Sequence, residues 1–386
     1  MTKSNDYISK QKFMEEFRRY QKGSVTRRHF LNVTGLGAAS AVMGMAVPGL
    51  RPRPAFAAGD IGDRVILATW PNYHDPANFD AFTEATGANV QVNVFGSNEE
   101  MLAKLQAGGS GWDVYVPTNY TITTYVAEGL IEPLDTARLT NYDPAAYDPR
   151  YAEAGSVDGV LYAVPKNWGT TGYAVNTSHT DGVAMTSWKQ FWDMTMDSFS
   201  GRTMVHDYQL TTIGNALKYF GYSFNSVAED ELAQAEKLLI DAKPHLFAIS
   251  SDYQPSMRNG DAWMTMCWTG DGKQLNTDIP EIAYVLGVEG GELWSDYYAI
   301  PKGAPHMDAA YALINFLLDP EVNAKEVLAH GYPSADAHTN ALLPESLLND
   351  PILYPAADLL NALEFGAAVT LTDPNRAELM ARFKSA

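Results

Sequence analysis

The sequence predicts an α/β protein with a largely parallel sheet, and three observations favour this class. Short apolar runs at residues 64–70, 89–95 and 112–116 have the length and the β-branched content of buried strands. Helical patterns at residues 77–86 and 98–107 separate these runs. Strands that alternate with helices form parallel sheets, and such sheets bind ligands at the carboxyl ends of their strands.

The elements follow one another with clear boundaries. Gly87 ends the helix at 77–86, and Gly108 and Gly109 follow the helix at 98–107. A second alternation of strands and helices begins after residue 200, and the tail from residue 344 is mostly helical. The further predicted strands are residues 203–206, 246–250, 262–268, 282–288 and 293–300, and the further helices are residues 212–220, 228–241, 255–259 and 308–318.

Residues 162–176 are predicted to join two lobes. Two strand-like runs flank a Trp-Gly-Thr-Thr turn that starts at Trp168. A polar turn between two apolar runs is typical of a crossing point in the chain.

The first 57 residues have the features of a twin-arginine signal peptide. A basic, polar stretch leads to Arg27-Arg28, two hydrophobic residues and a weakly apolar run rich in Gly and Ala. Residues 55–57, Ala-Phe-Ala, fit the small-x-small cleavage rule. The apolar run is too short and too rich in Gly to span a membrane stably. We therefore expect export of the folded protein and a location in the periplasm.

The predicted mature chain is strongly acidic. The first 57 residues contain 10 of the 27 Lys and Arg and 3 of the 46 Asp and Glu, so the remainder carries a formal net charge of −26. Such a surface repels nucleic acid and attracts cations, although solubility in a salty habitat explains the charge equally well. The single cysteine, Cys267, excludes a disulfide framework and any site built from clustered cysteines.

The motif that points most directly to a function is Trp294-x-Asp296. In a strand over residues 293–300, alternation directs both side chains to the same face. A carboxylate beside an aromatic ring holds a small organic cation, because the charges attract and the ring face attracts N–H and N–CH2 groups. The alternative is a buried core Trp beside an Asp that caps a turn.

The wider pattern of motifs resembles the spermidine- and putrescine-binding proteins of bacterial ABC importers. The motifs stand in the same order as in that family, and the likeness extends from Val65 to the C-terminus. They are Tyr162-Ala163-Val164-Pro165 with Trp168-Gly169-Thr170, Trp294-x-Asp296-x-x-Ala299-Ile300-Pro301, the block at 312–322, Gly331-Tyr332-Pro333 and Leu353-Tyr354-Pro355.

The resemblance implies a two-lobed periplasmic binding protein of type II, with each lobe a sheet flanked by helices and a ligand cleft between the lobes. The implied lobes are residues 58–170 with 295–340, and residues 171–294 with 341–386. The implied function is capture of a polyamine by a monomer and its delivery to a membrane permease. The resemblance implies no cofactor, no metal and no catalytic step.

The family's ligand residues can be carried over one position at a time. Aromatic, hydroxyl and acidic positions that match are Trp70, Tyr73, Thr118, Tyr120, Ser251, Trp268, Asp271, Trp294, Asp296 and Tyr332. Asp271 alone has an equally plausible role as a turn residue within residues 269–272.

Two departures concern the second amine of the ligand. Thr211 stands where relatives carry an acid, and Lys166 stands where an aromatic residue is common. Three explanations remain open: Asp207 or Asp252 substitutes for the missing acid, the ligand has one cationic end, or Lys166 meets the carboxylate of an ω-amino acid. If the second-amine site is empty, Thr211→Glu is expected to raise the affinity for putrescine.

Two other classes of protein remain as alternatives. Export of folded proteins also serves periplasmic oxidoreductases that carry a cofactor, but no nucleotide-binding glycine motif stands in the chain. A ferric-iron binder of similar fold would need clustered Tyr and acid ligands, and the second lobe has no adjacent Tyr pair of that kind.

Overall fold

The computed structural model describes residues 61–108 and 110–386. The predicted twin-arginine signal at residues 1–57 lies outside these residues. Within them, no helix has the length and apolar character that a membrane crossing requires.

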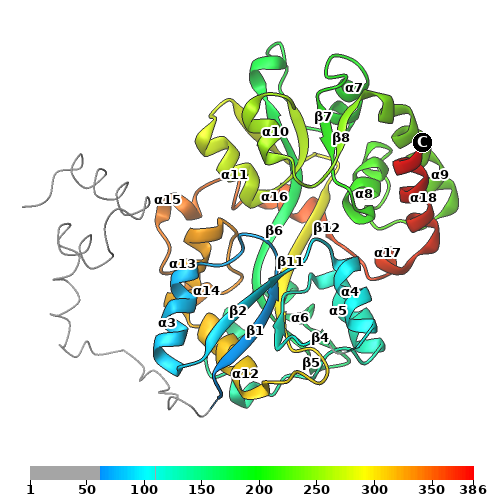
Figure 1. Cartoon of the computed structure of the whole chain (residues 1–386). Coiled ribbons are helices and arrows are strands. Elements are labelled where there is room, and N and C mark those ends of the chain that lie inside the picture. The colour runs from blue at the N-terminus through cyan, green and yellow to red at the C-terminus, as the bar shows by residue number, and fades with distance from the viewer. Residues whose placement is uncertain (1–60, 109) are drawn as a thin grey trace, which may run out of the picture. The chain divides into compact units, whose positions relative to one another are not determined.

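One continuous hydrogen-bonded sheet runs through the protein (Figure 1). Its strand order is β2-β1-β3-β11-β6-β9-β7-β8, with β10 added to β6 and β12 added to β11. Its strands are β1 (Arg64–Thr69), β2 (Asn89–Val94), β3 (Val114–Tyr115), β6 (Ala163–Asn176), β7 (Thr203–Val205), β8 (Leu246–Ile249), β9 (Met264–Trp268), β10 (Ile282–Val285), β11 (Gly291–Ala299) and β12 (Leu363–Phe365). A separate hairpin consists of β4 (Ser156–Val157) and β5 (Val160–Leu161).

The predicted parallel sheet is correct for two groups of strands and wrong where the groups meet. The pairs β1–β2, β1–β3, β7–β8 and β7–β9 are parallel, whereas every pair that includes β6 is antiparallel. The first part of β6 pairs with β11, and its last part lies between β9 and β10. The long strands β6 and β11 therefore connect the two groups of parallel strands, as Figure 1 shows.

The turn predicted at Trp168 does not exist, because residues 163–176 form one strand of 14 residues. Trp294 of β11 lies directly across from Gly169. A Cβ atom at Gly169 would come within 2.4 Å of the Trp294 indole ring. The glycine is therefore needed for close approach of the indole, and not for a turn.

Helices cover the sheet. They are α3 (Pro76–Thr86), α4 (Asn98–Gln106), α5 (Asn119–Ala127), α6 (Pro149–Glu153), α7 (Trp188–Met196), α8 (Gln209–Tyr219), α9 (Glu229–Ala242), α10 (Gln254–Asn259), α11 (Thr269–Asp278), α12 (Met307–Leu317), α13 (Pro320–His330), α14 (Ala337–Asn340), α15 (Glu345–Leu348), α16 (Ala357–Ala362), α17 (Val369–Thr372) and α18 (Pro374–Ser385). Local sequence sets several ends. The Asp75 side chain caps α3, and Gly87 ends it in the left-handed conformation. Residues 269–272, considered above as a turn, form the first turn of α11.

Two large hydrophobic clusters hold the elements together. One includes Val65 and Leu67 of β1, Phe82 of α3 and Leu313 of α12. The other joins α7, α8, α9 and α18 to β6 and β9. Each group of strands thus has its own core, which is the arrangement that two lobes require.

Arg376 fixes α18 to the second group of elements. Its side chain is fully buried, and its guanidinium donates hydrogen bonds to the carbonyl oxygens of Phe224, Ser226 and Leu210 at 3.3, 2.9 and 3.2 Å. Burial lowers the pKa of Arg376 to about 10, so the group stays charged at neutral pH. The bond to Leu210 anchors the first turn of α8, which also carries Thr211.

Replacing this guanidinium should destabilise the fold. Arg376→Met should lower the free energy of unfolding by about 3 kcal/mol or more, because three buried carbonyl groups lose their donor. Urea denaturation followed by circular dichroism measures this loss. Arg382→Met is the matched control, because Arg382 lies on the same helix and pairs with Glu236 at the surface. An equal shift of the midpoint in both variants would contradict the structural role of Arg376.

Candidate functional site

The site is built on one face of the β6–β11 pair. Three cross-strand pairs follow one another on this face: Asp296 opposite Asn167, Trp294 opposite Gly169, and Glu292 opposite Thr171. Alternation along a strand explains why residues 292, 294 and 296 share a face. From the sequence, only Trp294 and Asp296 were expected on this face, because the predicted strand began at residue 293.

Asp296 is a buried carboxylate held by neutral donors. Its side chain is 4% exposed. Thr118 donates to Oδ1 at 2.7 Å, and the Tyr73 hydroxyl donates to Oδ2 at 2.7 Å. Tyr73 also lies 2.8 Å from the Asn167 Oδ1 atom, so one hydroxyl proton is shared between two acceptors. Burial raises the pKa of Asp296 to about 6, although Thr118, Tyr73 and Lys166 partly offset this rise.

The chain brings Thr118 and Tyr73 to Asp296 from two strand ends. Tyr73 follows β1 in the turn that leads to α3. Thr118 follows β3, and its backbone forms an isolated bridge with Asp296. Both positions follow the carboxyl ends of parallel strands, which is where such sheets bind ligands.

Aromatic rings surround the carboxylate. Trp294 and Tyr332 meet edge to face with ring centres 5.2 Å apart, and Tyr73 and Tyr332 do so at 5.4 Å. Trp70 and Trp268 are half-buried and pack against the hydrophobic cluster that contains Trp294 and Tyr332. Five predicted site residues therefore form one aromatic group that draws on both groups of strands.

Lys166 is buried beneath this group. Its Nζ atom lies 4.0 Å from the centre of the Tyr73 ring. Within residues 61–108 and 110–386, no hydrogen-bond partner and no carboxylate at ion-pairing distance reaches this ammonium. Burial lowers the pKa of Lys166 to about 8, although the charges of Glu326 and Asp296 partly offset this fall.

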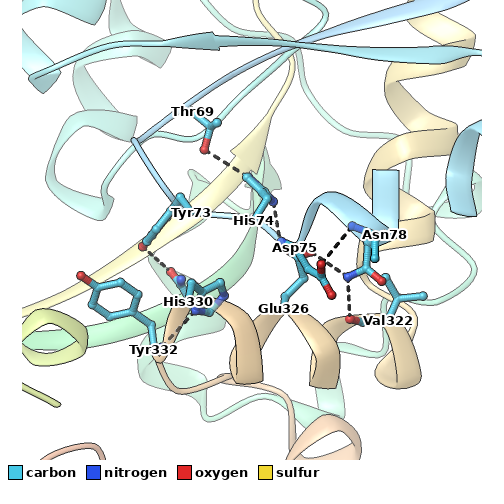
Figure 2. A network of polar contacts seen from close by, with 11 residues as sticks. Thr69, Tyr73, His74, Asp75, Asn78, Val322, Glu326, His330 and Tyr332 are labelled. Carbon is cyan, nitrogen blue, oxygen red and sulfur yellow. Dashed lines mark hydrogen bonds and ion pairs between the residues drawn. The ribbon is translucent and has the colours of Figure 1, made fainter. Parts of the chain in front are cut away.

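Glu326 of α13 lies at the centre of a polar network (Figure 2), and its charge acts on Lys166. It is 2.7 Å from the Nδ1 atom of His74 and accepts from the Asn78 amide at 2.7 Å. The Nε2 atom of His74 lies 3.1 Å from the Thr69 hydroxyl. Burial lowers the pKa of His74, so this ring is neutral at neutral pH and its contact with Glu326 is a hydrogen bond. Burial alone would raise the pKa of Glu326, but His74, Lys166 and Asn78 together bring it below its ordinary value.

Thr211 is fully buried and contacts an acid that the sequence analysis missed. Its hydroxyl lies 2.9 Å from Oε2 of Glu292 and 2.6 Å from the Tyr208 hydroxyl. Thr171 donates to the same Glu292 oxygen at 2.6 Å. Glu292 is 3% exposed, and burial raises its pKa to about 7, with the charge of Asp296 adding to the rise. The available signal was its position two residues before Trp294 on an alternating strand.

Neither of the two acids considered as substitutes at Thr211 is buried. Asp207 is exposed and accepts a hydrogen bond from Ser251 at 2.6 Å. Asp252 is exposed as well. Both carboxylates are therefore solvated, whereas Glu292 is enclosed and in direct contact with Thr211.

The remaining predicted site residues lie around the edge of the aromatic group. Asp271 accepts from the Tyr253 hydroxyl at 2.8 Å, and its charge adds to the rise in the pKa of Tyr332. Tyr120 is buried, accepts from the Asn98 amide at 2.8 Å and packs against Leu210 of α8. Ser251 is bonded to Asp207, and no hydrogen bond in the described part of the chain joins it to the Asp296 group.

A cavity of about 280 Å³ lies elsewhere, between α11, α13 and the segment around residue 350. Lys273, Thr277, Val327 and Leu353 contribute to its walls. None of the predicted site residues lines it. In the described residues there is also no group of three metal-binding side chains.

Known proteins match this chain over most of its length. The family of bacterial extracellular solute-binding proteins matches residues 77–354. The spermidine/putrescine-binding periplasmic protein 1 of Haemophilus influenzae is 31% identical over 309 residues, which cover 79% of this chain and 84% of that protein. The putrescine-binding periplasmic protein SpuD of Pseudomonas aeruginosa is 29% identical over 312 residues, which cover 76% of this chain and 84% of that protein.

A solved structure gives the same result. The spermidine/putrescine ABC transporter substrate-binding protein of Streptococcus pneumoniae matches with a TM-score of 0.71 and 27% identity, covering 84% of this chain and 99% of that chain. The two-lobed fold expected from the sequence is therefore confirmed, and the chain belongs to the bacterial extracellular solute-binding proteins.

Proposed function

We propose that this protein captures a polyamine of the putrescine or spermidine type in the periplasm and delivers it to the membrane permease of an ABC importer. The observation that carries the proposal is Asp296, a buried carboxylate whose oxygens receive hydrogen bonds from Thr118 and Tyr73. These neutral donors orient the carboxylate without neutralising it. A buried charge without a counter-charge costs several kcal/mol, and a ligand ammonium would remove that cost.

The aromatic group supplies the other half of the proposed site. Trp294, Tyr332, Trp70 and Trp268 of this group, together with Tyr120 at its edge, would form flat walls for the carbon chain of the ligand. Each contact between an ammonium and an aromatic face contributes roughly 0.5–2 kcal/mol in a site from which water is excluded. The proposed role of the protein is binding by a monomer, with no chemical step.

The names of the relatives support the same class of ligand. The matched proteins of Haemophilus influenzae and Pseudomonas aeruginosa are named for binding spermidine and putrescine, or putrescine. A solute-binding family also counts against the alternative of an oxidoreductase that carries a cofactor.

An ω-amino acid ligand is less well supported. It would require Lys166 to meet the ligand carboxylate. The ammonium of Lys166 lies against the Tyr73 ring, and the charges of Glu326 and Asp296 act on it. These contacts favour an internal role, in which Lys166 balances the buried Glu326.

The proposal predicts a large effect at Asp296. Asp296→Asn keeps the shape of the side chain and removes its charge, so the affinity for putrescine should fall at least about tenfold, the loss expected for one hydrogen bond to a charged group. Isothermal titration calorimetry measures this change. Asp80→Asn is the control, because it removes one charge from the exposed face of α3. An unchanged affinity in Asp296→Asn, with the fold intact by circular dichroism, would refute the proposal.

The affinity should also rise with pH. Burial raises the pKa of Asp296 to about 6, and an aliphatic ammonium stays charged up to about pH 10. Below pH 6 the acid is protonated and cannot pair with the amine, so binding weakens. Two neighbours titrate in the same sense: Glu292 gains its charge near pH 7, and Lys166 loses its charge near pH 8.

Titrations between pH 5 and 8 test this dependence. Putrescine binding should release protons below about pH 7, and the heat should therefore vary with the ionisation enthalpy of the buffer. The change in putrescine affinity with pH should be smaller in Asp296→Asn. An affinity that is flat across this range would show that no buried carboxylate accepts the amine.

A further inference from the structure

We propose that Glu292 binds the second ammonium group of a diamine whose first ammonium group binds Asp296. This inference rests on the function proposed above. It assigns the second carboxylate of the site to β11 itself, in place of the acid that is missing at Thr211.

The two acids stand on the same strand and the same face, with Trp294 between them. Their Cα atoms are four positions apart along the strand, which corresponds to a distance of about 13 Å. A four-carbon diamine has six heavy atoms joined by five bonds of about 1.5 Å, and a hydrogen bond of about 2.8 Å extends its reach at each end. The two carboxylates are thus spaced for one extended ligand that lies across the Trp294 ring.

Hydrogen bonds to one oxygen of Glu292 orient its carboxylate and leave the other oxygen available to a ligand. Thr171 and Thr211 both contact Oε2. Among the residues that the structure describes, no hydrogen bond reaches the other oxygen, Oε1. Oε1 is not among the fully buried side-chain atoms that lack a partner, so this oxygen can accept a hydrogen bond from a ligand.

A chain of hydrogen bonds connects this acid to the aromatic group. The Trp268 indole N–H donates to the Tyr208 hydroxyl at 3.2 Å. Tyr208 lies 2.6 Å from the Thr211 hydroxyl, which lies 2.9 Å from Glu292. Each hydroxyl has one proton, so Tyr208 donates to Thr211 while Thr211 donates to Glu292. Thr211 therefore positions the acid and is not itself the acceptor of an ammonium.

The buried charges favour a dication. Four enclosed side chains at this site can carry a charge near neutral pH: Asp296, Glu292, Glu326 and Lys166. Lys166 balances one of the three acids, and burial keeps His74 and His330 neutral. Two negative charges then remain without a counter-charge, and both lie on β11. A ligand with two ammonium groups neutralises both.

A comparison of two amines tests the assignment. Putrescine and n-butylamine have the same carbon chain and differ in one ammonium group. At pH 8 both carboxylates are ionised. Titration calorimetry of the purified protein should show that putrescine binds at least about tenfold more tightly than butylamine. In Glu292→Gln this preference should fall to about threefold or less, with the affinity for butylamine nearly unchanged.

Controls separate this inference from the proposed function. Glu281→Gln removes an exposed charge and should keep the full preference for putrescine. If the unaltered protein binds neither amine, the proposed function fails. If it prefers putrescine and Glu292→Gln keeps that preference, only the role of Glu292 fails. Glu99 is a second, half-buried acid nearby, and its charge acts on Tyr120 and Tyr208. If Glu99→Gln also loses the preference for putrescine, the preference is not specific to Glu292 and the proposed role of Glu292 fails.

Substitution at Thr211 gives an independent test. Thr211→Glu would add a carboxylate next to Glu292, and two like charges in contact cannot both ionise. Thr211→Glu should therefore bind putrescine no more tightly than Thr211→Gln, which has the same size without the charge. This reverses the expectation drawn from the sequence. Tighter binding by Thr211→Glu than by Thr211→Gln would show that the second-amine site is empty and would overturn the role of Glu292.

Discussion

The structure depends on a pair of buried carboxylates that the chain does not neutralise. Asp296 and Glu292 receive hydrogen bonds from hydroxyl groups. These bonds orient the two carboxylates but do not neutralise their negative charge. Burial raises the pKa of both acids, which is the sign that their ionised forms lack a compensating charge. Buried acids with shifted pKa values are concentrated at functional sites. Binding of a cation is the simplest function that would neutralise these two carboxylates.

The β6–β11 pair holds the two acids in place despite the free-energy cost of burying their charges. Its length and its antiparallel register place both acids on one face, with the indole of Trp294 between them. Gly169 allows the indole to lie against the backbone of β6. The same two strands connect the two groups of the sheet, so the proposed ligand-binding acids lie where the two groups meet. In the proposed role, closure of the lobes around a ligand would exclude water and strengthen each contact with the ammonium groups.

The sequence predicted much of this arrangement because local patterns encode it. The strand and helix boundaries agree with the structure to within a few residues, since caps and glycines mark them. Asp296 and Trp294 were recognised from alternation on one strand. Glu292 follows from the same alternation but was missed, because the predicted strand began at residue 293, two residues after its start at Gly291. The turn expected at Trp168 was wrong, since the need for glycine there arises from an indole more than 120 residues away.

Lys166 illustrates a limit of sequence reasoning. Its effect depends on Glu326, which is distant in the chain and which the sequence analysis did not select. Glu326 is bonded to His74 and Asn78, so its charge is fixed beneath Tyr73. Lys166 offsets that charge and lies on the Tyr73 ring, whose hydroxyl points at Asp296. The lysine therefore prevents a third uncompensated acid at the site. Without it three negative charges would remain buried, and a ligand with two ammonium groups would no longer match them.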